Sequence, residues 1–103
     1  MGYTMPHKRS RLIFRRKTVF EDAAIVEMRV WQVPKSARTP EGFKYSLVYV
    51  GSRGERVLGY DNAEGKGHHR HFRGLENAER FHSMSALVAR FLVEVGELRG
   101  AQE

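Results

Sequence analysis

The apolar residues of the C-terminal third recur at steps of three and four, and this spacing constrains the fold more than any other feature of the chain. The apolar stripe comprises Leu75, Ala78, Phe81, Met84, Val88, Phe91 and Val95. Such spacing places the side chains on one face of a helix, about 100° wide. We therefore predict an amphipathic helix that begins near Leu75, buries this stripe, and stops at about Gly100, since glycine is a common helix terminator.

The residues before this stripe favour strands instead of helices. Residues 25–33 are rich in β-branched side chains, with Val26, Met28 and Val30 on one face, and Pro34 ends the run. Residues 45–50 and 56–61 flank a glycine-containing turn at 51–54, which indicates a β-hairpin. With a first strand at 11–20, the prediction is an α+β fold: a four-stranded antiparallel sheet, β-β-β-β-α, with the helix packed on one face.

Length and composition indicate one domain that is held together by packing alone. The chain has 103 residues and no cysteine, which excludes disulfides, thiolate metal sites and a cysteine nucleophile. Its apolar runs are too short to cross a membrane, and no apolar segment follows the basic N-terminus as in a signal peptide. We expect a cytoplasmic protein with a flexible tail at residues 1–10 and a single domain at 11–103.

The positive charge of the chain is concentrated at its N-terminal end. The net charge is +6; residues 1–20 hold six Lys or Arg and no acid, which leaves 12 Lys and Arg against 12 Asp and Glu in the remainder. Such a patch attracts polyanions. Arg11, Arg15, Arg16 and Lys17 lie in the first predicted strand, so we expect them to contact nucleic acid or an acidic partner; a merely solvating role is the alternative.

The segment of residues 60–72 carries the chemistry that the sequence offers. It joins a predicted strand end to a glycine-rich stretch with three of the five histidines, which are His68, His69 and His71. Histidine can exchange protons near neutral pH, and Lys66 and Arg70 could stabilise a phosphorane. Asp61 would orient a histidine, and Tyr60 would bind phosphate together with Lys66 and Arg70. A ribonuclease that uses the substrate's 2′-hydroxyl needs only a base, an acid and a cation.

Three other interpretations of this segment stay open. His69 and His71 would share a face in an extended chain and could bind a metal with Asp61 or Glu64, but no zinc spacing is met. The glycine amides could bind a phosphate without any chemistry, although the P-loop spacing does not occur. The segment could also be a plain polar loop. We predict no cofactor and no metal ligand.

Several short motifs of the chain resemble those of TumE-type toxins from bacterial toxin–antitoxin pairs. The similarity spans about residues 11–95, and its most specific part is YDNA at 60–63 followed by GKGHHRH at 65–71. VWQVP at 30–34 and YSL at 45–47 also resemble the family. The matching residues of the specific element are Tyr60, Asp61, Asn62, Lys66, His68, His69 and His71.

The resemblance implies a toxin that a helix-turn-helix antitoxin binds and silences. We combine it with the histidine-rich segment into the expectation of a toxin that acts on RNA, as a metal-independent endoribonuclease. The competing expectation is a non-catalytic module that binds nucleic acid or protein and uses its histidine-rich segment for an anion or a metal. RNA and the antitoxin are the expected partners, a membrane is not, and the sequence allows a homo-oligomer.

Overall fold

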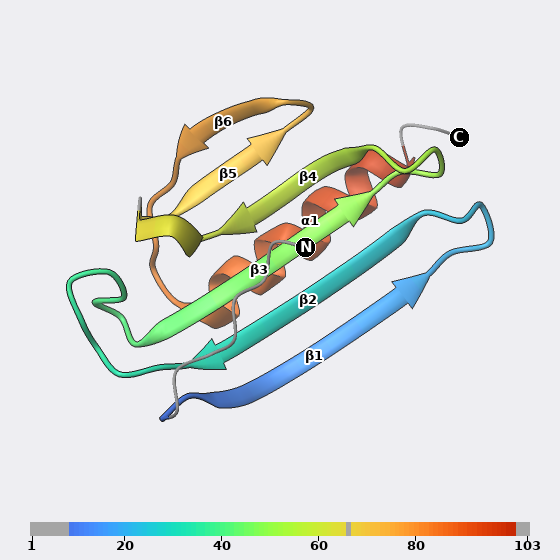
Figure 1. Ribbon diagram of the computed structural model, residues 1–103. Helices are drawn as coiled ribbons and strands as arrows, with labels where there is room; N and C mark the ends of the chain where they lie inside the picture. The colour runs from blue at the N-terminus through green and yellow to red at the C-terminus, as the bar shows by residue number, and fades with distance from the viewer. Residues whose placement is uncertain (1–8, 66, 101–103) are drawn as a thin grey trace.

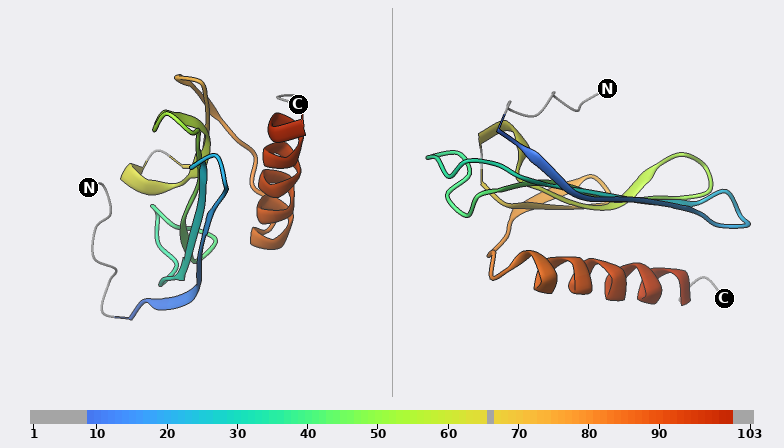
Figure 2. Two further views of the ribbon diagram at one scale, coloured as in Figure 1. Left: turned by 90° about the vertical axis from the view of Figure 1, so that its right-hand side faces the viewer. Right: turned by 90° about the horizontal axis from the view of Figure 1, so that it is seen from below.

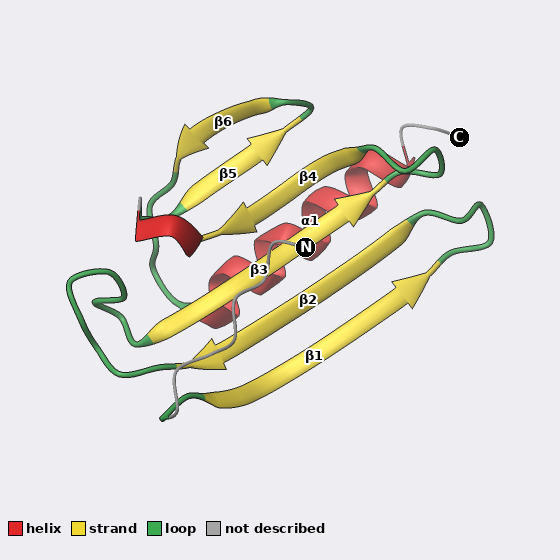
Figure 3. Cartoon of the chain, in the orientation of Figure 1, coloured by secondary structure: helices red, strands yellow, loops and turns green. Residues whose placement is uncertain are grey.

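A computed structural model describes residues 9–65 and 67–100, which form one antiparallel sheet and one helix (Figures 1 and 3). The six strands lie in the sheet in chain order. They are β1 (Arg11–Val19), β2 (Ile25–Gln32), β3 (Phe43–Val50), β4 (Arg56–Asp61), β5 (His69–Phe72) and β6 (Leu75–Ala78). A single 3-10 turn, η1 (Ala63–Gly65), follows β4, and the helix α1 (Met84–Gly100) closes the described chain.

The predicted α+β class is confirmed, but the sheet has six strands where four were expected. The expected strands correspond to β1–β4, and the hairpin at 51–54 is present, with the Gly51 amide donating to the Glu55 carbonyl. The two additional strands form a second hairpin, β5–β6, turned by Arg73 and Gly74. Both residues have positive φ, 49° and 87°, as the tightest hairpin turn requires.

The helix begins nine residues later than the apolar spacing predicted. Residues Leu75–Ala78 pair with β5 as the edge strand β6, so the first part of the apparent stripe belongs to the sheet. Ser83 provides the true start of the helix because its Oγ accepts a hydrogen bond from the Ala86 amide at 3.1 Å. This is the bond that an N-cap side chain makes.

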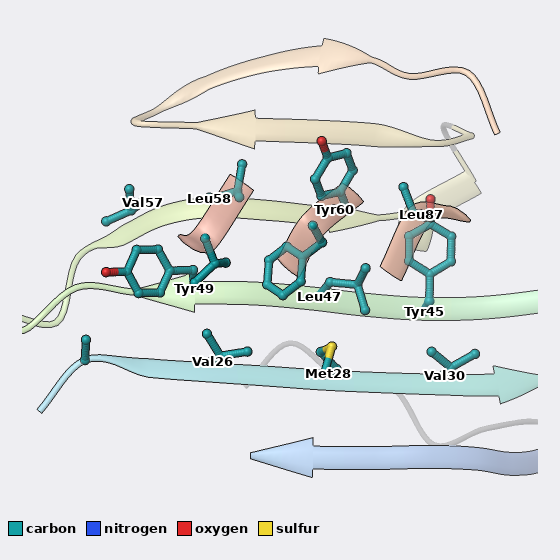
Figure 4. Packing of buried hydrophobic residues seen from close by; sticks show 13 residues of the cluster. Val26, Met28, Val30, Tyr45, Leu47, Tyr49, Val57, Leu58, Tyr60 and Leu87 are labelled. Carbon is teal, nitrogen blue, oxygen red and sulfur yellow. The ribbon is translucent and has the colours of Figure 1, made fainter. Parts of the chain in front are cut away.

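The core lies between α1 and one face of the sheet. Alternate residues of the central strands point to it: Val26, Met28 and Val30 from β2, Tyr45, Leu47 and Tyr49 from β3, and Leu58 and Tyr60 from β4 (Figure 4). Leu87, Phe91 and Val95 of α1, four residues apart, complete it. The predicted common face of Val26, Met28 and Val30 is confirmed as a core face, as is the helical face at 88–95.

The opposite face of the sheet is not covered by α1, and we call it the open face. Figure 2 shows α1 on one side of the sheet only. Strand alternation sends Trp31, Asp61, His69 and His71 to the open face. Trp31 is therefore a half-buried residue of this face. No helix among the described residues is long and apolar enough to cross a membrane.

Candidate functional site

The motif YDNA at the end of β4 connects the core, the open face and the neighbouring strand. Tyr60 points into the core and Asp61 to the open face. Asn62 is buried, and its side chain continues the sheet beyond β4: Oδ1 accepts from the Tyr45 amide at 3.0 Å, and Nδ2 donates to the Phe43 carbonyl at 2.7 Å. The motif thus fixes the position at which Asp61 is presented.

His71 is held by a charged group at each ring nitrogen. Its Nε2 lies 3.0 Å from Asp61 Oδ2, and its Nδ1 lies 3.2 Å from an Arg56 guanidinium nitrogen. Because arginine can only donate, Nδ1 accepts from Arg56 and Nε2–H donates to Asp61. The expected role of Asp61 in orienting a histidine therefore has the required geometry, at His71.

His69 lies beside His71 on the same face and has its own carboxylate. Its Nδ1 is 3.2 Å from Glu76 Oε2, an atom that also lies 4.0 Å from His71 Nε2. Only 15% of the His69 side chain and 16% of the His71 side chain are exposed. Arg56, Asp61, His69, His71 and Glu76 form a compact group, which we call the histidine cluster.

His68 does not join this cluster, because it lies on the other side of the sheet. Its ring stacks on Phe81, with 4.5 Å between ring centroids. Its Nδ1 is 2.8 Å from the Tyr45 hydroxyl, and its Nε2 is 3.0 Å from Glu41 Oε1. His68 therefore ties the 34–42 loop and the β6–α1 connection to the core, and the three predicted histidines do not converge.

Arg70 also faces the helix and is engaged there. It lies 2.6 Å from Glu94 Oε2 and donates to the Tyr60 hydroxyl at 3.2 Å, while that hydroxyl donates to Glu94 Oε1. Burial, and then the hydrogen bond to Glu94, raise the pKa of Tyr60 to about 12. This triad fastens β5 to α1, so the predicted phosphate-binding residues Arg70 and Tyr60 lie away from the histidine cluster.

The four predicted basic contacts of β1 divide between the two faces of the sheet. Arg15 and Lys17 lie opposite Arg29 and Glu27 and thus on the open face. Arg11 and Arg16 lie opposite Gln32 and Met28, on the helix face. All four are exposed.

Glu27 joins the basic residues of two neighbouring strands. Its Oε2 lies 3.0 Å from both Arg15 and Arg29. Burial tends to raise the pKa of Glu27, but the hydrogen bonds and charges of Arg29 and Arg15 outweigh it and lower that pKa. The open face of β1 and β2 is thus a charged surface on which the Glu27 carboxylate holds Arg15 and Arg29 close together.

Two of the residues considered for metal or phosphate binding are not fully described in the structure. Lys66 lies outside the described residues, and the side chain of Glu64 is likewise not described. Among the side chains that are described, no group of three or more His, Asp or Glu is arranged to hold a metal ion.

Arg56 and Glu76 are the cluster members that sequence reasoning missed. Arg56 was assigned only to a strand, and Glu76 to the helix. The strand register brings both to His71, since β5 places His71 opposite Gly59 of β4 and opposite Glu76 of β6. Recognising a hairpin at Arg73-Gly74 would have revealed Glu76 as the partner of His71.

Comparison with known protein families places the chain in one of them. The family model described as Toxin TumE matches residues 3–99, nearly the whole chain. Neither the curated proteins nor the solved structures contain a match.

Proposed function

Since the chain belongs to the TumE toxin family, we propose that it is the toxin of a bacterial toxin–antitoxin pair and that it cleaves RNA without a metal ion. The observation that carries this proposal is the pairing of His71 with Asp61, next to His69, on the sheet face that α1 does not cover. A carboxylate-oriented histidine beside a second histidine is a suitable arrangement for general acid–base catalysis.

His71 is the general base in this proposal. Asp61 holds the proton on Nε2, which leaves the lone pair on Nδ1. When the exposed Arg56 moves from Nδ1 to the substrate phosphate, Nδ1 can take the proton of a ribose 2′-hydroxyl. The 2′-oxygen then attacks the adjacent phosphorus, and the guanidinium stabilises the charge of the phosphorane.

His69 is the general acid. As the bond from phosphorus to the 5′-oxygen breaks, His69 gives its proton to that oxygen, and the charge of the Glu76 carboxylate, 3.2 Å from Nδ1, favours the protonated ring beforehand. The products are a 2′,3′-cyclic phosphate and a 5′-hydroxyl. One proton is taken and one is given, so the two histidines exchange roles when water opens the cyclic phosphate.

Arg15 and Lys17 would guide the RNA to the cluster. They share the open face with His69 and His71, and four strand spacings of about 4.8 Å put β1 roughly 19 Å from β5. A few nucleotides span such a distance. Arg11 and Arg16 face the other way, and Arg70 is bound to Glu94, so this proposal assigns them no contact with the same RNA strand. Lys66 remains a candidate phosphate ligand.

An RNA cleavage assay with and without EDTA tests the assignment. We expect cleavage that persists in EDTA, leaves cyclic phosphate ends, and falls by at least about 100-fold in His71→Ala, as the loss of a general base predicts. Asp61→Asn should lower the rate as well, since it keeps the shape of the side chain but no longer fixes the tautomer. His82→Ala, an exposed histidine outside the cluster, is the matched control and should retain full activity.

Three results would contradict the proposal. Intact RNA with the wild-type protein excludes a nuclease, and RNA that is bound but not cut favours the non-catalytic binding module. Loss of cleavage in EDTA points to a metal. Equal rates for His71→Ala and His82→Ala, in folded protein, would move the catalytic groups elsewhere.

A further inference from the structure

The strand β1 forms an edge of the sheet that is long, exposed and rich in cations. Among the described strands it pairs with β2 alone (Figure 1), and eight of its nine residues are exposed. An edge strand turns the N–H and C=O groups of every second residue away from the sheet, where they can pair with another strand. The opposite edge, β6, has only four residues, and short edge strands are poor templates.

The cations of β1 lie on both faces of this edge, and this distribution indicates what it can bind. Arg15 and Lys17 point to the open face, and Arg11 and Arg16 to the helix face. RNA laid across the open face would meet only the first pair. A polypeptide strand added alongside β1 presents its own side chains alternately to both faces, so it can meet all four.

We propose that β1 accepts an extended acidic segment of a partner protein as a seventh strand. Arg11, Arg16 and Lys17 form no ion pair within the described part of the chain, so their charges are available to carboxylates directly across the new ladder. Opposite charges at facing positions stabilise a strand pair, and like charges destabilise it.

The apolar residues at one end of β1 specify the segment further. Leu12 and Ile13 are 49% and 48% exposed, and they precede the cations at 15–17. In an antiparallel arrangement, the segment would therefore begin with acidic residues opposite 15–17 and continue with apolar residues opposite 12–14. This is strand addition, in which backbone hydrogen bonds supply affinity and side chains supply specificity.

A second copy of the chain does not fit this edge. Two β1 strands paired with each other would bring two sets of four cations together, and this repulsion disfavours the pair. The same charges that prevent self-association thus select an acidic partner. If the chain is the toxin of a toxin–antitoxin pair, as the proposed function states, that partner is the antitoxin. Its segment would then also cover Arg15 and Lys17 and compete with RNA for them.

Amide hydrogen exchange of the full chain, measured with and without a synthetic peptide, tests this proposal. The peptide has about ten residues and is acidic in its first half and rich in Val and Ile in its second half. With the peptide at ten times its Kd, we expect exchange of outward β1 amides to slow about tenfold, with no change in β6. A peptide N-methylated at alternate residues carries the same charges but cannot join the ladder, so it should give no protection.

Charge-reversal variants supply the second arm. Arg16→Glu with Lys17→Glu reverses one cation on each face and should weaken peptide binding by at least tenfold, about 1.4 kcal/mol. Arg53→Glu with Arg80→Glu changes the net charge equally at exposed positions away from β1 and should bind as the wild type does.

Several outcomes would overturn the proposal. They are no protection of β1, equal binding of the N-methylated peptide, equal weakening by both double variants, or protection of β1 by single-stranded RNA but not by the peptide. RNA cleavage takes no part in these measurements, so failure of the nuclease proposal would leave strand addition standing, and the reverse also holds.

Discussion

Asn62 illustrates how one buried polar side chain can position a site without belonging to it. It is the one buried polar side chain among the described residues, and both ends of its amide satisfy backbone groups at the start of β3. Buried backbone groups must be paired, so the sheet continues past Asp61 through a side chain instead of a strand. Asp61 is thereby held where His71 can reach it.

Replacing Asn62 by alanine should strongly destabilise the domain. The change leaves the Tyr45 amide and the Phe43 carbonyl without partners, and we expect a loss of about 3 kcal/mol in the free energy of unfolding. For a domain of this size, Tm would fall by more than about 10 °C. Asn77→Ala, at an exposed position of β6, is the control, and equal Tm values for the two variants would refute this role.

At the scale of elements, two sequence signals place the start of the helix differently: the spacing of apolar residues places it at Leu75, and the capping residue Ser83 places it at Met84. If α1 began at Leu75, Ser83 would lie inside the helix, and alanine there would stabilise it. With Ser83 at the N-cap, Ser83→Ala removes the bond to the Ala86 amide. We expect a loss of about 1 kcal/mol, measured by urea unfolding. Ser52→Ala in the β3–β4 turn should have little effect, and a gain in stability in Ser83→Ala would contradict the observed boundary.

The sequence predicts the central strands and the second half of the helix because their apolar side chains alternate with the correct period. Val26, Met28 and Val30 all pack in the core, so apolar residues recur at every second position of this part of the sequence. The β5–β6 hairpin leaves no such pattern: every residue of β6 is exposed, and β5 is polar except for Phe72. The strand β5 pairs with the edge of β4, and β6 pairs with β5. These pairings depend on residues elsewhere in the chain and not on a local pattern.

The candidate site could be predicted in part for the same reason. Residue types pointed to Asp61, His69 and His71, and strand alternation gave His69 and His71 a common face. Alternation also separates them from His68 and Arg70, but this follows only once 69–72 is recognised as a strand. Arg56 and Glu76 reach His71 through the register of β4 and β6, which no local pattern encodes.

At the scale of the whole molecule, one layer of polar contacts fastens the helix to the sheet. Glu94 accepts from Tyr60 and Arg70, and Arg99 donates to the Tyr49 hydroxyl at 3.1 Å. Burial raises the pKa of Tyr45 as well. Because the Tyr60 hydroxyl donates its proton to Glu94 of α1, this contact between helix and sheet depends on the Tyr60 phenol staying protonated.

The pKa of Tyr60 predicts how the fold responds to alkaline conditions. It rises from 10.0 to about 12 on folding, so the folded protein keeps a proton that the unfolded chain releases above pH 10. A raised pKa contributes stability that is present below pH 10 and is lost as the pH approaches 12. The resulting loss in the free energy of unfolding from Tyr60 is at most about 3 kcal/mol. Urea unfolding midpoints measured from pH 9 to pH 12 would follow it.

Tyr60→Phe separates this titration from the other groups. The variant loses the hydrogen bond to Glu94 and should be less stable at pH 8 by about 1 kcal/mol. Between pH 10 and pH 12 its stability should fall less than that of the wild type, because the contribution of the Tyr60 phenol is absent. The two stability curves should therefore converge at high pH. Parallel curves would mean that the Tyr60 hydroxyl titrates alike in the folded and unfolded chains and does not hold the helix in place.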